Sequence, residues 1–365
     1  MLKTYRFRLY PNSEQKEYFA KSFGCVRFLY NQMLADRIEL YQKYKHDKEE
    51  LKKHKPRSYT SFKSEYEWLR EVDNLALANA QMNLNSAYQK FFKEGAGFPK
   101  FKSKRKSKAS YRTNNQGGNI RIEGKKVKLP KIGWIKLKYH RPFDGLIKSC
   151  TVSQLPSGKY YISILVEKDD ITWIPAKNKI GIDLGLTDFV VAINDGGVSE
   201  KYSNPKHLYK SEKQLKKAQK ALSRKKIGSK NRDKSRIFLA KKHERIANQR
   251  KDFLHKLSHK MTNENQVIVI ETLKSSNMVK NRKLAKSISD VSWYEFTRQL
   301  QYKADWLGRT IIKADQWFAS TQICNECETN GGKKPLHVRE WKCANCGAKH
   351  DRDINASKNL LKLAK

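Results

Sequence analysis

Four cysteines near the C-terminal end constrain this chain more than any other feature of its sequence. They form two CxxC pairs, Cys324 with Cys327 and Cys343 with Cys346, and fifteen residues separate the pairs. Two such knuckles at this separation can bring four thiolates around one tetrahedral zinc ion. Because four thiolates leave no open position for water, the sequence predicts a structural zinc site that these four cysteines complete.

The net charge of +41 is the second constraint, because 77 basic residues stand against only 36 acidic ones. Repulsion of this size opposes a compact state unless an anion is bound, and a nucleic acid is the polyanion that such charge best complements. The alternatives are a ribosome-associated or chaperoned basic protein and a membrane-surface protein. The second is disfavoured, since no single amphipathic segment holds the charge.

The sequence offers no sign of a membrane partner. No run approaches the ~18 apolar residues of a membrane span, and the first twelve residues contain no apolar signal core. Four cysteines in CxxC pairs fit a reducing compartment with a metal site. We therefore expect an intracellular protein.

The first quarter of the chain changes from one short strand to helices. Residues 1–10 alternate between apolar and basic side chains, which is typical of a strand, and Pro11 ends it. Asn12 can cap a helix with Gln15 at the reciprocal position, and apolar residues then recur at helical spacing. We expect a helical domain of three or four helices over residues 11–95.

Short strands separated by turn residues follow as far as about Glu167, which predicts a small β-barrel with the N-terminal strand as a candidate member. From Ile180 onward, apolar strands and helices imply an α/β layer. Its strands are expected at residues 180–185, 189–193, 267–270 and 310–313, and its helices at about 206–225, 233–262 and 290–307.

Two carboxylates lie at the ends of apolar strands in this α/β region. Asp183 has mostly apolar neighbours, and an ionised carboxylate there is costly unless something positive meets it. Glu271 directly follows a buried strand, at the end where α/β sheets place their chemistry. Gly181 and Gly185 flank Asp183 and would let a ligand backbone approach closely. The structural alternatives are a turn aspartate that caps the next residues and a glutamate that marks the strand's exit to solvent.

Asp351 and Asp353 open an expected helix over residues 354–364, directly after the second cysteine pair. Aspartate is a good N-cap, so we expect one of the two to cap the helix while the other faces the sheet. Three carboxylates from two strand ends and a helix start can hold two Mg²⁺ ions roughly 4 Å apart, which activate a water and stabilise a leaving oxygen. In so basic a chain, this pattern indicates metal-dependent chemistry on a phosphate backbone.

The ordered motifs of the chain resemble those of the TnpB family, transposon-encoded, RNA-guided DNA nucleases related to the type V CRISPR effectors. The motifs are GIDLGL, VIVIE, CxxC…CxxCG and HDRDINASKN, and the segments LANAQMNLNSAYQKFF and GFPKFKSK are also similar. The resemblance spans nearly the whole chain. It implies an α+β multidomain fold with a RuvC, RNase H-like α/β nuclease domain, a zinc-knuckle insertion, a β-barrel wedge domain and a helical recognition domain.

The same resemblance implies domain boundaries and site residues. The wedge would comprise residues 1–10 with 96–172, the recognition domain 11–95, the nuclease domain 173–320 with 350–365, and the zinc-binding insertion 321–349. The implied catalytic triad, which would hold Mg²⁺, is Asp183, Glu271 and Asp353. Asp353 is preferred to Asp351 because the family aspartate directly precedes an x-Asn-Ala step, here residues 354–356.

Nucleic-acid contacts are expected in two places. The segment 111–114 resembles one that reads a short motif beside the target in the family, and the basic helix from Lys234 to Lys256 is a candidate wall for a guide duplex. A solvated helix face is the alternative for that helix. The residues expected to contact nucleic acid are Gln81, Thr113, Asn114, Lys241, Lys242 and Arg245.

The implied function is an RNA-guided DNA endonuclease that acts beside a short target-adjacent motif in the prokaryotic cytoplasm or nucleoid. Its partners would be a guide RNA transcribed near the gene, with one protein chain per RNA, and a double-stranded DNA target. Charge and spacing alone indicate only a basic metal nuclease. Two alternatives stay open: a non-cleaving DNA-binding repressor, which the intact triad disfavours, and a strand-joining transposase, which also uses three carboxylates.

Overall fold

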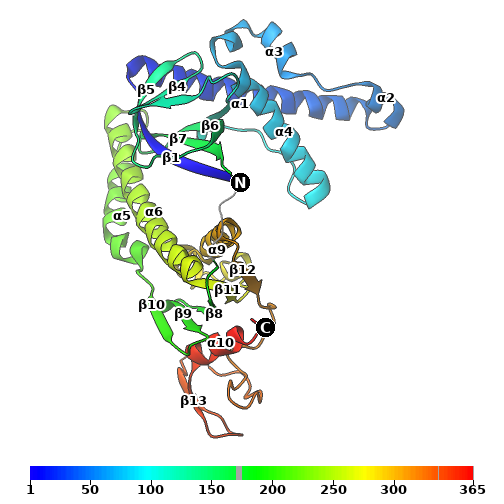
Figure 1. Cartoon of the computed structure of the whole chain (residues 1–365). Helices are drawn as coiled ribbons and strands as arrows, with labels where there is room; N and C mark the ends of the chain where they lie inside the picture. The colour runs from blue at the N-terminus through cyan, green and yellow to red at the C-terminus, as the bar shows by residue number, and fades with distance from the viewer. Residues whose placement is uncertain (170–174, 336, 365) are drawn as a thin grey trace. The chain divides into compact units, whose positions relative to one another are not determined.

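The computed structural model of the chain describes residues 1–169, 175–335 and 337–364, and it has two compact units, Met1–Asp170 and Ile171–Lys365 (Figure 1). The expected boundary between residues 172 and 173 lies outside the described residues. Each unit is described by itself below.

The first unit is built on an antiparallel sheet in which the N-terminal strand is central. The seven strands are β1 (Leu2–Tyr10), β2 (Ala109–Asn114), β3 (Arg121–Glu123), β4 (Lys126–Leu129), β5 (Gly133–Lys138), β6 (Leu146–Gln154) and β7 (Tyr160–Glu167). Their order is β2-β6-β7-β1-β5-β4-β3, so the N-terminal strand does join the strand-rich region, as predicted. Because no pairing among the described strands links β2 to β3, the expected barrel is an open half-barrel.

Helices are the other elements of the first unit, and the first and last of them contact strand β2. They are α1 (Ser13–Tyr44), α2 (Lys48–Lys53), α3 (Tyr59–Glu65), the 3-10 turn η1 (Glu67–Glu71) and α4 (Asn74–Glu94). The predicted capping box starts α1: the Gln15 amide donates to Asn12 Oδ1 at 2.8 Å, and the Asn12 amide donates to Gln15 Oε1 at 3.1 Å. Phe19 of α1 stacks on Tyr160 of β7 with ring centroids 5.6 Å apart. The helices and the half-barrel therefore share one hydrophobic core.

The second unit has a mixed five-stranded sheet in the order β10-β9-β8-β11-β12. The strands are β8 (Asn178–Leu184), β9 (Asp188–Asn194), β10 (Ser199–Ser203), β11 (Asn265–Ile270) and β12 (Thr310–Lys313). The first three pair antiparallel, and β11 runs parallel to both β8 and β12. The carboxyl ends of β8 and β11 therefore lie side by side at one edge of the sheet.

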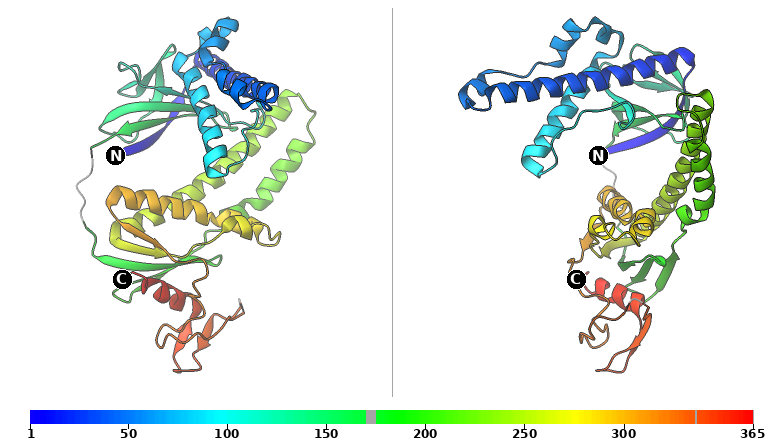
Figure 2. Two further views of the ribbon diagram at one scale, coloured as in Figure 1. Left: turned by 90° about the vertical axis from the view of Figure 1, so that its right-hand side faces the viewer. Right: turned by 180° about the vertical axis from the view of Figure 1, so that it is seen from behind.

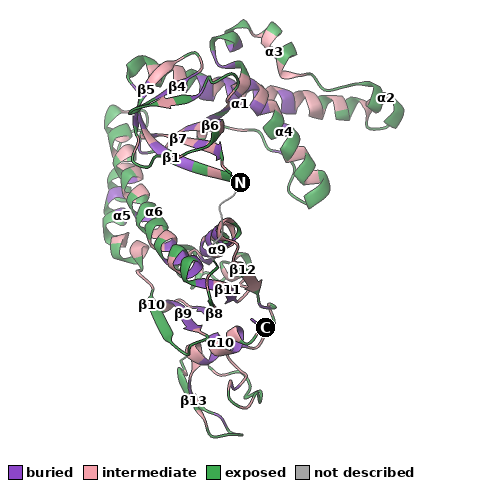
Figure 3. Ribbon diagram, in the orientation of Figure 1, coloured by how far each residue is buried: buried purple, intermediate pink, exposed green. Residues whose placement is uncertain are grey.

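Helices cover both faces of this sheet (Figures 2 and 3). The helices are α5 (His207–Ser223), α6 (Lys230–Glu264), α7 (Ser275–Met278), α8 (Ala285–Val291), α9 (Trp293–Leu307) and α10 (Arg352–Leu361). On one face, Ile268 and Ile270 of β11 share a core with α6 and α9. On the other face, Val269 packs with Leu360 of α10. The alternation of side chains along β11 thus produces a helix–sheet–helix sandwich.

The expected helix over residues 290–307 corresponds to α9, and the short helix α8 precedes it. Ser292 between them has a φ of +59°, and its amide donates to the Ile288 carbonyl, which ends α8. The apolar periodicity continues across the break because Val291 and Trp293 are both buried. Among the described helices, none is long and apolar enough to cross a membrane.

Candidate metal centre and carboxylate site

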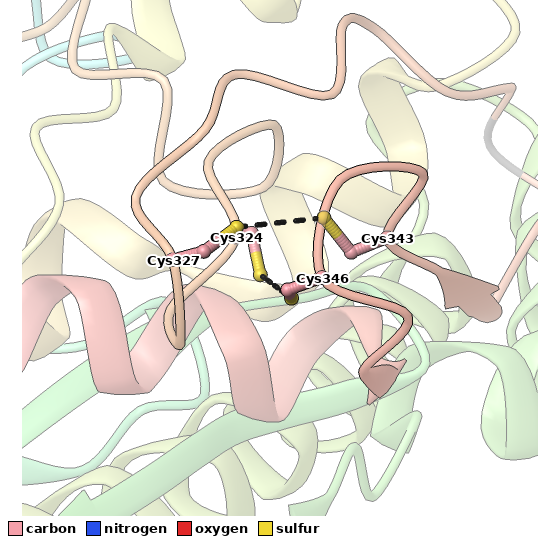
Figure 4. Close-up of side chains that lie close together, drawn as sticks. All are labelled: Cys324, Cys327, Cys343 and Cys346. Atoms are coloured by element: carbon pink, nitrogen blue, oxygen red, sulfur yellow. Dashed lines mark hydrogen bonds between the residues drawn. The ribbon is translucent and has the colours of Figure 1, made fainter.

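The four cysteines meet in one cluster in the second unit (Figure 4). Cys324 Sγ lies 3.7 Å from Cys346 Sγ, Cys327 Sγ lies 3.6 Å from Cys343 Sγ, and all four sulfurs lie within 4.8 Å of one another. A tetrahedral zinc with Zn–S bonds of ~2.3 Å separates its sulfurs by about 3.8 Å. The sulfur positions therefore suit one zinc ion, and all four cysteines are free of disulfides.

A short hairpin holds the second knuckle of this cluster. Strands β13 (Glu340–Lys342) and β14 (Lys349–Asp351) pair antiparallel and flank Cys343 and Cys346. Hydrogen bonding to Thr329, and then to Asn345, lowers the pKa of the Cys327 thiol to about 5. Because the thiolate is the form that binds metal, Cys327 favours the ligating state before any ion arrives. For the Cys346 thiol, the Ala348 backbone hydrogen bond lowers the pKa, but hydrogen bonds with the other cysteines outweigh it and raise the pKa to about 12.

The cysteine cluster also fixes the start of α10. The first knuckle is tied to this helix, since the Asn325 amide donates to Asn355 Oδ1 at 3.0 Å and Asn355 Nδ2 donates to the Ile323 carbonyl at 2.8 Å. The second knuckle leads through β14 directly into α10. Any loss of the cluster should therefore disturb the helix that carries Asp353.

Asp183 and Glu271 lie at the carboxyl ends of the neighbouring parallel strands β8 and β11. The register pairs Ile182 with Ile270, so each carboxylate comes one residue after a paired position. Only 8% of Asp183 is exposed, and the Leu184 amide donates to Glu271 Oε1 at 2.8 Å. The backbone of one strand thus holds the carboxylate of the other.

The two aspartates at the start of α10 have different partners, as the sequence suggested. Asp351 is the N-cap: its Oδ1 accepts from the amides of Asp353 and Ile354, each at 3.0 Å. Asp351 Oδ2 also pairs with Lys201 Nζ at 2.6 Å. Asp353 lies in the first turn of α10, and its charge acts on Asp183 and Glu271. Of the two aspartates, it is therefore Asp353 whose charge acts on the two buried carboxylates, while Asp351 caps the helix.

Burial and mutual repulsion make ionisation of this site unfavourable. Burial, followed by the charges of Glu271 and Asp353, raises the pKa of Asp183 well above its usual value. Burial also raises the pKa of Glu271 to about 7; the Leu184 hydrogen bond opposes this effect and the charge of Asp353 adds to it. Buried carboxylates that repel one another need a positive partner in order to ionise together. Their oxygens are ligands that Mg²⁺ accepts.

Arg339 is a residue of this site that the sequence analysis missed. Its Nη1 lies 3.2 Å and 3.0 Å from the two carboxylate oxygens of Asp353. Arg339 comes from the segment between the cysteine pairs, where it is one basic residue among 77. Only the folded hairpin brings it to the carboxylates, so no sequence signal could have singled it out.

The two glycines beside Asp183 correct an expectation. A Cβ on Gly181 would lie 2.2 Å from the Ser357 carbonyl oxygen, and one on Gly185 would lie 2.4 Å from the Asp188 carbonyl oxygen. The prediction that these glycines admit a ligand backbone is therefore wrong. Instead, the backbone of α10 packs closely against Gly181, and the backbone at the β8–β9 turn packs closely against Gly185.

The residues expected to contact nucleic acid have varied surroundings. Lys241 and Arg245 on α6 are exposed, whereas Lys242 Nζ donates to Gln214 on α5 at 3.0 Å. The remaining three residues belong to the first unit. Gln81 Oε1 accepts a hydrogen bond from the Tyr59 amide at 2.8 Å. Asn114 is partly buried at the end of β2, whereas Thr113 is wholly buried and its hydroxyl has no hydrogen-bond partner.

A cavity of about 500 Å³ opens beside β2 in the first unit. Tyr111 and Arg112 of β2 line it together with the amide side chains of Asn79 and Asn83 on α4. Basic side chains also line it, from Arg27, Lys102 and Lys108. The segment that the sequence marks as a motif reader therefore borders a cavity rich in amides and cations.

Three family models match the chain. A model described as "Probable transposase" matches residues 163–282, and one described as "Cas12f1-like, TNB domain" matches residues 293–360. The third, described as "Helix-turn-helix domain", matches residues 1–46. In that range the structure has the strand β1 and the single long helix α1.

Two similar proteins match over nearly their whole length. A "Putative RNA-guided DNA endonuclease" of Streptomyces pristinaespiralis is 38% identical over 98% of this chain and 88% of its own. The "Putative RNA-guided DNA endonuclease InsQ" of Escherichia coli K12 is 31% identical over 99% of this chain and 92% of its own.

A solved structure shares the fold at low sequence identity. The protein in a cryo-EM structure of a Cas12f1–sgRNA–target DNA complex is 12% identical, with a TM-score of 0.63 over 99% of this chain and 98% of that one. This likeness confirms the predicted fold class as an α+β multidomain chain.

Proposed function

The chain belongs to the TnpB family of RNA-guided DNA endonucleases, and we propose that it cleaves DNA phosphodiester bonds at Asp183, Glu271 and Asp353 under the direction of a guide RNA. The observation that carries this proposal is that Asp183 and Glu271 lie at the ends of neighbouring parallel strands and have raised pKa values, to which the charge of Asp353 contributes after burial. Buried carboxylates that resist joint ionisation are a chemical match for a divalent cation.

Mg²⁺ is the cation that we assign to these residues, because the donor set is carboxylate oxygen throughout. When bound, Mg²⁺ would supply activation of a water and stabilisation of the leaving oxygen, with two ions as the expected number. The Leu184 amide would keep Glu271 oriented toward the site. Arg339 would neutralise Asp353 until a cation competes for that carboxylate.

We assign the four-cysteine cluster a structural role. Four thiolates complete a zinc shell and leave no position for a reacting water. The ties from the first knuckle to Asn355 and from β14 into α10 would let zinc hold Asp353 in register with the sheet. In this scheme residues 321–349 are a zinc-binding insertion in a nuclease domain of residues 173–320 and 350–365.

Guide RNA and double-stranded DNA are the proposed partners, with one chain per RNA. The exposed Lys241 and Arg245 on α6 support a backbone-binding face, since a channel for a guide duplex needs charge rather than base readout. We propose that the cavity beside β2 reads the target-adjacent motif, with Arg112 and the amides of α4 as contacts. Within residues 1–172, the wedge would be 1–10 with 96–172 and the recognition domain 11–95.

The test is purification of the protein from cells that carry its native flanking DNA, followed by sequencing of the RNA that accompanies it. One discrete RNA mapping beside the gene would support guided action and supply the scaffold for a Mg²⁺-dependent cleavage assay on matched DNA. A mixture of unrelated cellular RNAs would refute guidance, and the net charge of +41 would then reflect only non-specific attraction to RNA.

A strand-joining activity is the second candidate, because the model matching residues 163–282 is described as a transposase and such enzymes also use three carboxylates. Incubation with transposon ends distinguishes the two activities, since only a transposase would produce joined strands. A protein that binds the guided target without cutting or joining it would instead be a repressor.

A further inference from the structure

A preformed cavity lies within the second unit at the turn that follows the strand of Asp183. Its volume is about 480 Å³, which is within the ~300–1,000 Å³ range of small-ligand sites. It is bordered by the β8–β9 turn, the segment that leads into α5, and α8. The chemistry proposed above for the carboxylates does not use it.

Side-chain hydrogen bonds hold two walls of this cavity in place. Asn204 Nδ2 donates to the Leu186 carbonyl at 2.9 Å, and the Asn204 amide donates to the Thr187 carbonyl at 3.2 Å, which ties the β8–β9 turn to the chain before α5. Across the cavity, Asp290 Oδ2 on α8 accepts from the Leu208 amide at 3.1 Å, and Asp290 also pairs with Arg250 on α6. The cavity is therefore built into the fold and does not depend on loose side chains.

The lining combines the groups that bind a single unstacked nucleotide. Leu186 and Leu208 provide apolar surface for a base, and the hydroxyl groups of Thr187 and Ser287 offer hydrogen bonds to its edge. Lys206 is exposed at the rim and can meet a phosphate. Two charged residues of the lining already have ionic partners: Lys286 pairs with Glu212, and Asp290 pairs with Arg250. The lining therefore does not present a strong charge of one sign.

Tyr209 is the aromatic side chain of this lining, and 73% of it is exposed. An exposed ring at the rim of a cavity can stack on a base, and stacking of this kind tolerates any base because each one has a π face. If a guide selects the DNA sequence, the enzyme must hold strands of any sequence. A stacking site that does not discriminate between bases meets this need.

The cavity is close to the carboxylates along the chain. Leu186 comes three residues after Asp183, so their Cα atoms are at most about 11 Å apart at 3.8 Å per residue. A DNA strand with one phosphate at Asp183 can therefore reach the cavity with a nucleotide near the cut.

We propose that this cavity holds an unstacked nucleotide of the DNA strand being cleaved, with Tyr209 stacked on its base and Lys206 on its phosphate. The inference rests on the proposed function and deepens it, because it gives the enzyme a sequence-independent grip that positions the strand over the carboxylates. Tyr209 and Lys206 are positioning residues in this scheme.

The first experiment compares Tyr209→Ala and Tyr209→Phe in the RNA-bound protein. Loss of one base stack is expected to raise the KM for the cleaved strand about 5- to 150-fold in Tyr209→Ala. The strand would also be held less firmly, so the cut position should spread over neighbouring nucleotides. Tyr209→Phe keeps the ring and should retain the wild-type KM and cut position. Tyr294→Ala is the matched control, because Tyr294 on α9 is 75% exposed and does not line the cavity.

A second measurement does not depend on cleavage. Single-stranded DNA that carries the fluorescent base 2-aminopurine is added to the RNA-bound Asp183→Ala protein, with and without the further Tyr209→Ala change. Stacking on Tyr209 predicts quenching that Tyr209→Ala relieves and Tyr294→Ala does not.

The outcomes separate the inference from the proposed function. Equal KM, cut position and quenching for Tyr209→Ala and Tyr294→Ala would overturn the inference while leaving the nuclease in place. A wild-type protein that cleaves nothing would refute the proposed function, and the quenching would still decide whether the cavity binds a nucleotide. Reduced retention of guide RNA by Tyr209→Ala, with unchanged DNA quenching, would make this an RNA site and would also overturn the inference.

Discussion

Replacement of Glu271 by glutamine is expected to stabilise the metal-free protein at alkaline pH. The side chain keeps its shape and its oxygen can still accept from the Leu184 amide, while the buried charge is removed. In the folded state burial raises the pKa of Glu271 to about 7, against an ordinary value of 4.5. Between pH 4.5 and pH 7, the folded state therefore keeps a proton on Glu271 that the unfolded state has already released.

The direction of the pH effect follows from this difference. Stability rises with pH only where the unfolded state binds more protons, and here the folded state binds more. The contribution of Glu271 to stability is complete below about pH 4.5 and is lost as the pH rises through 7. At about 1.4 kcal/mol for each pKa unit, the loss approaches 3 kcal/mol by pH 8. Glu271→Gln escapes this loss, so its advantage should grow from near zero at pH 4.5.

The assay is thermal unfolding of the wild type and of Glu271→Gln at several values between pH 5 and 8, without added divalent cations. For a unit as large as Ile171–Lys365, 1 kcal/mol corresponds to roughly 2–4 °C, so the expected gain in Tm at pH 8 is about 6–12 °C. Added Mg²⁺ should then stabilise the wild type more than the variant, because a bound ion stabilises the form that ligates it.

The matched control is Glu264→Gln, which removes an exposed glutamate from the end of α6. It should leave the pH dependence unchanged. If Glu271→Gln melts with the wild type at pH 8, or if its advantage is the same at pH 5, the fold does not penalise the charge of Glu271 and the argument for a cation site fails.

Three further changes test other parts of the structure. Asp183→Ala should abolish cleavage and leave nucleic-acid binding nearly intact; full cutting by this variant would remove the triad assignment. Cys324→Ser should lower the zinc content from about one ion per chain and reduce the Tm of the second unit, because the cluster holds α10; unchanged metal content and melting would contradict the zinc site. Gly181→Ala should destabilise by about 2 kcal/mol or more in a melting experiment, since its Cβ meets the Ser357 carbonyl oxygen at 2.2 Å. The control, Gly24→Ala, has open space in α1 and should not destabilise; equal melting of the two variants would show that α10 yields easily.

Local pattern was enough to predict much of this fold. The box of Asn12 and Gln15 starts a helix because both partners lie within one turn. The cysteine spacing brings four sulfurs together because each knuckle is a short turn that closes on itself. Glu271 is at a strand end because the apolar run before it stops there.

Long-range packing decided what these patterns left open. Asp351 and Asp353 are equivalent as N-cap candidates by residue type, and the family resemblance favours Asp353 only for the triad. The hydrogen bonds at the start of α10 identify Asp351 as the cap. Thr113 belongs to a motif segment, yet alternation along β2 turns its side chain into the core.

What the sequence by itself determined is which residues have the chemistry for a metal site and a nucleic-acid partner, since charge, ligand type and spacing are properties of the chain. Only the tertiary structure decided which of them act together. Arg339 reaches Asp353 through a hairpin, and Tyr209 comes to rim the cavity beside the β8–β9 turn through the packing of α5 and α8. The physical reason is that neither encounter follows from local pattern: one depends on how a hairpin closes, and the other on how a helix start packs against a helix much later in the chain.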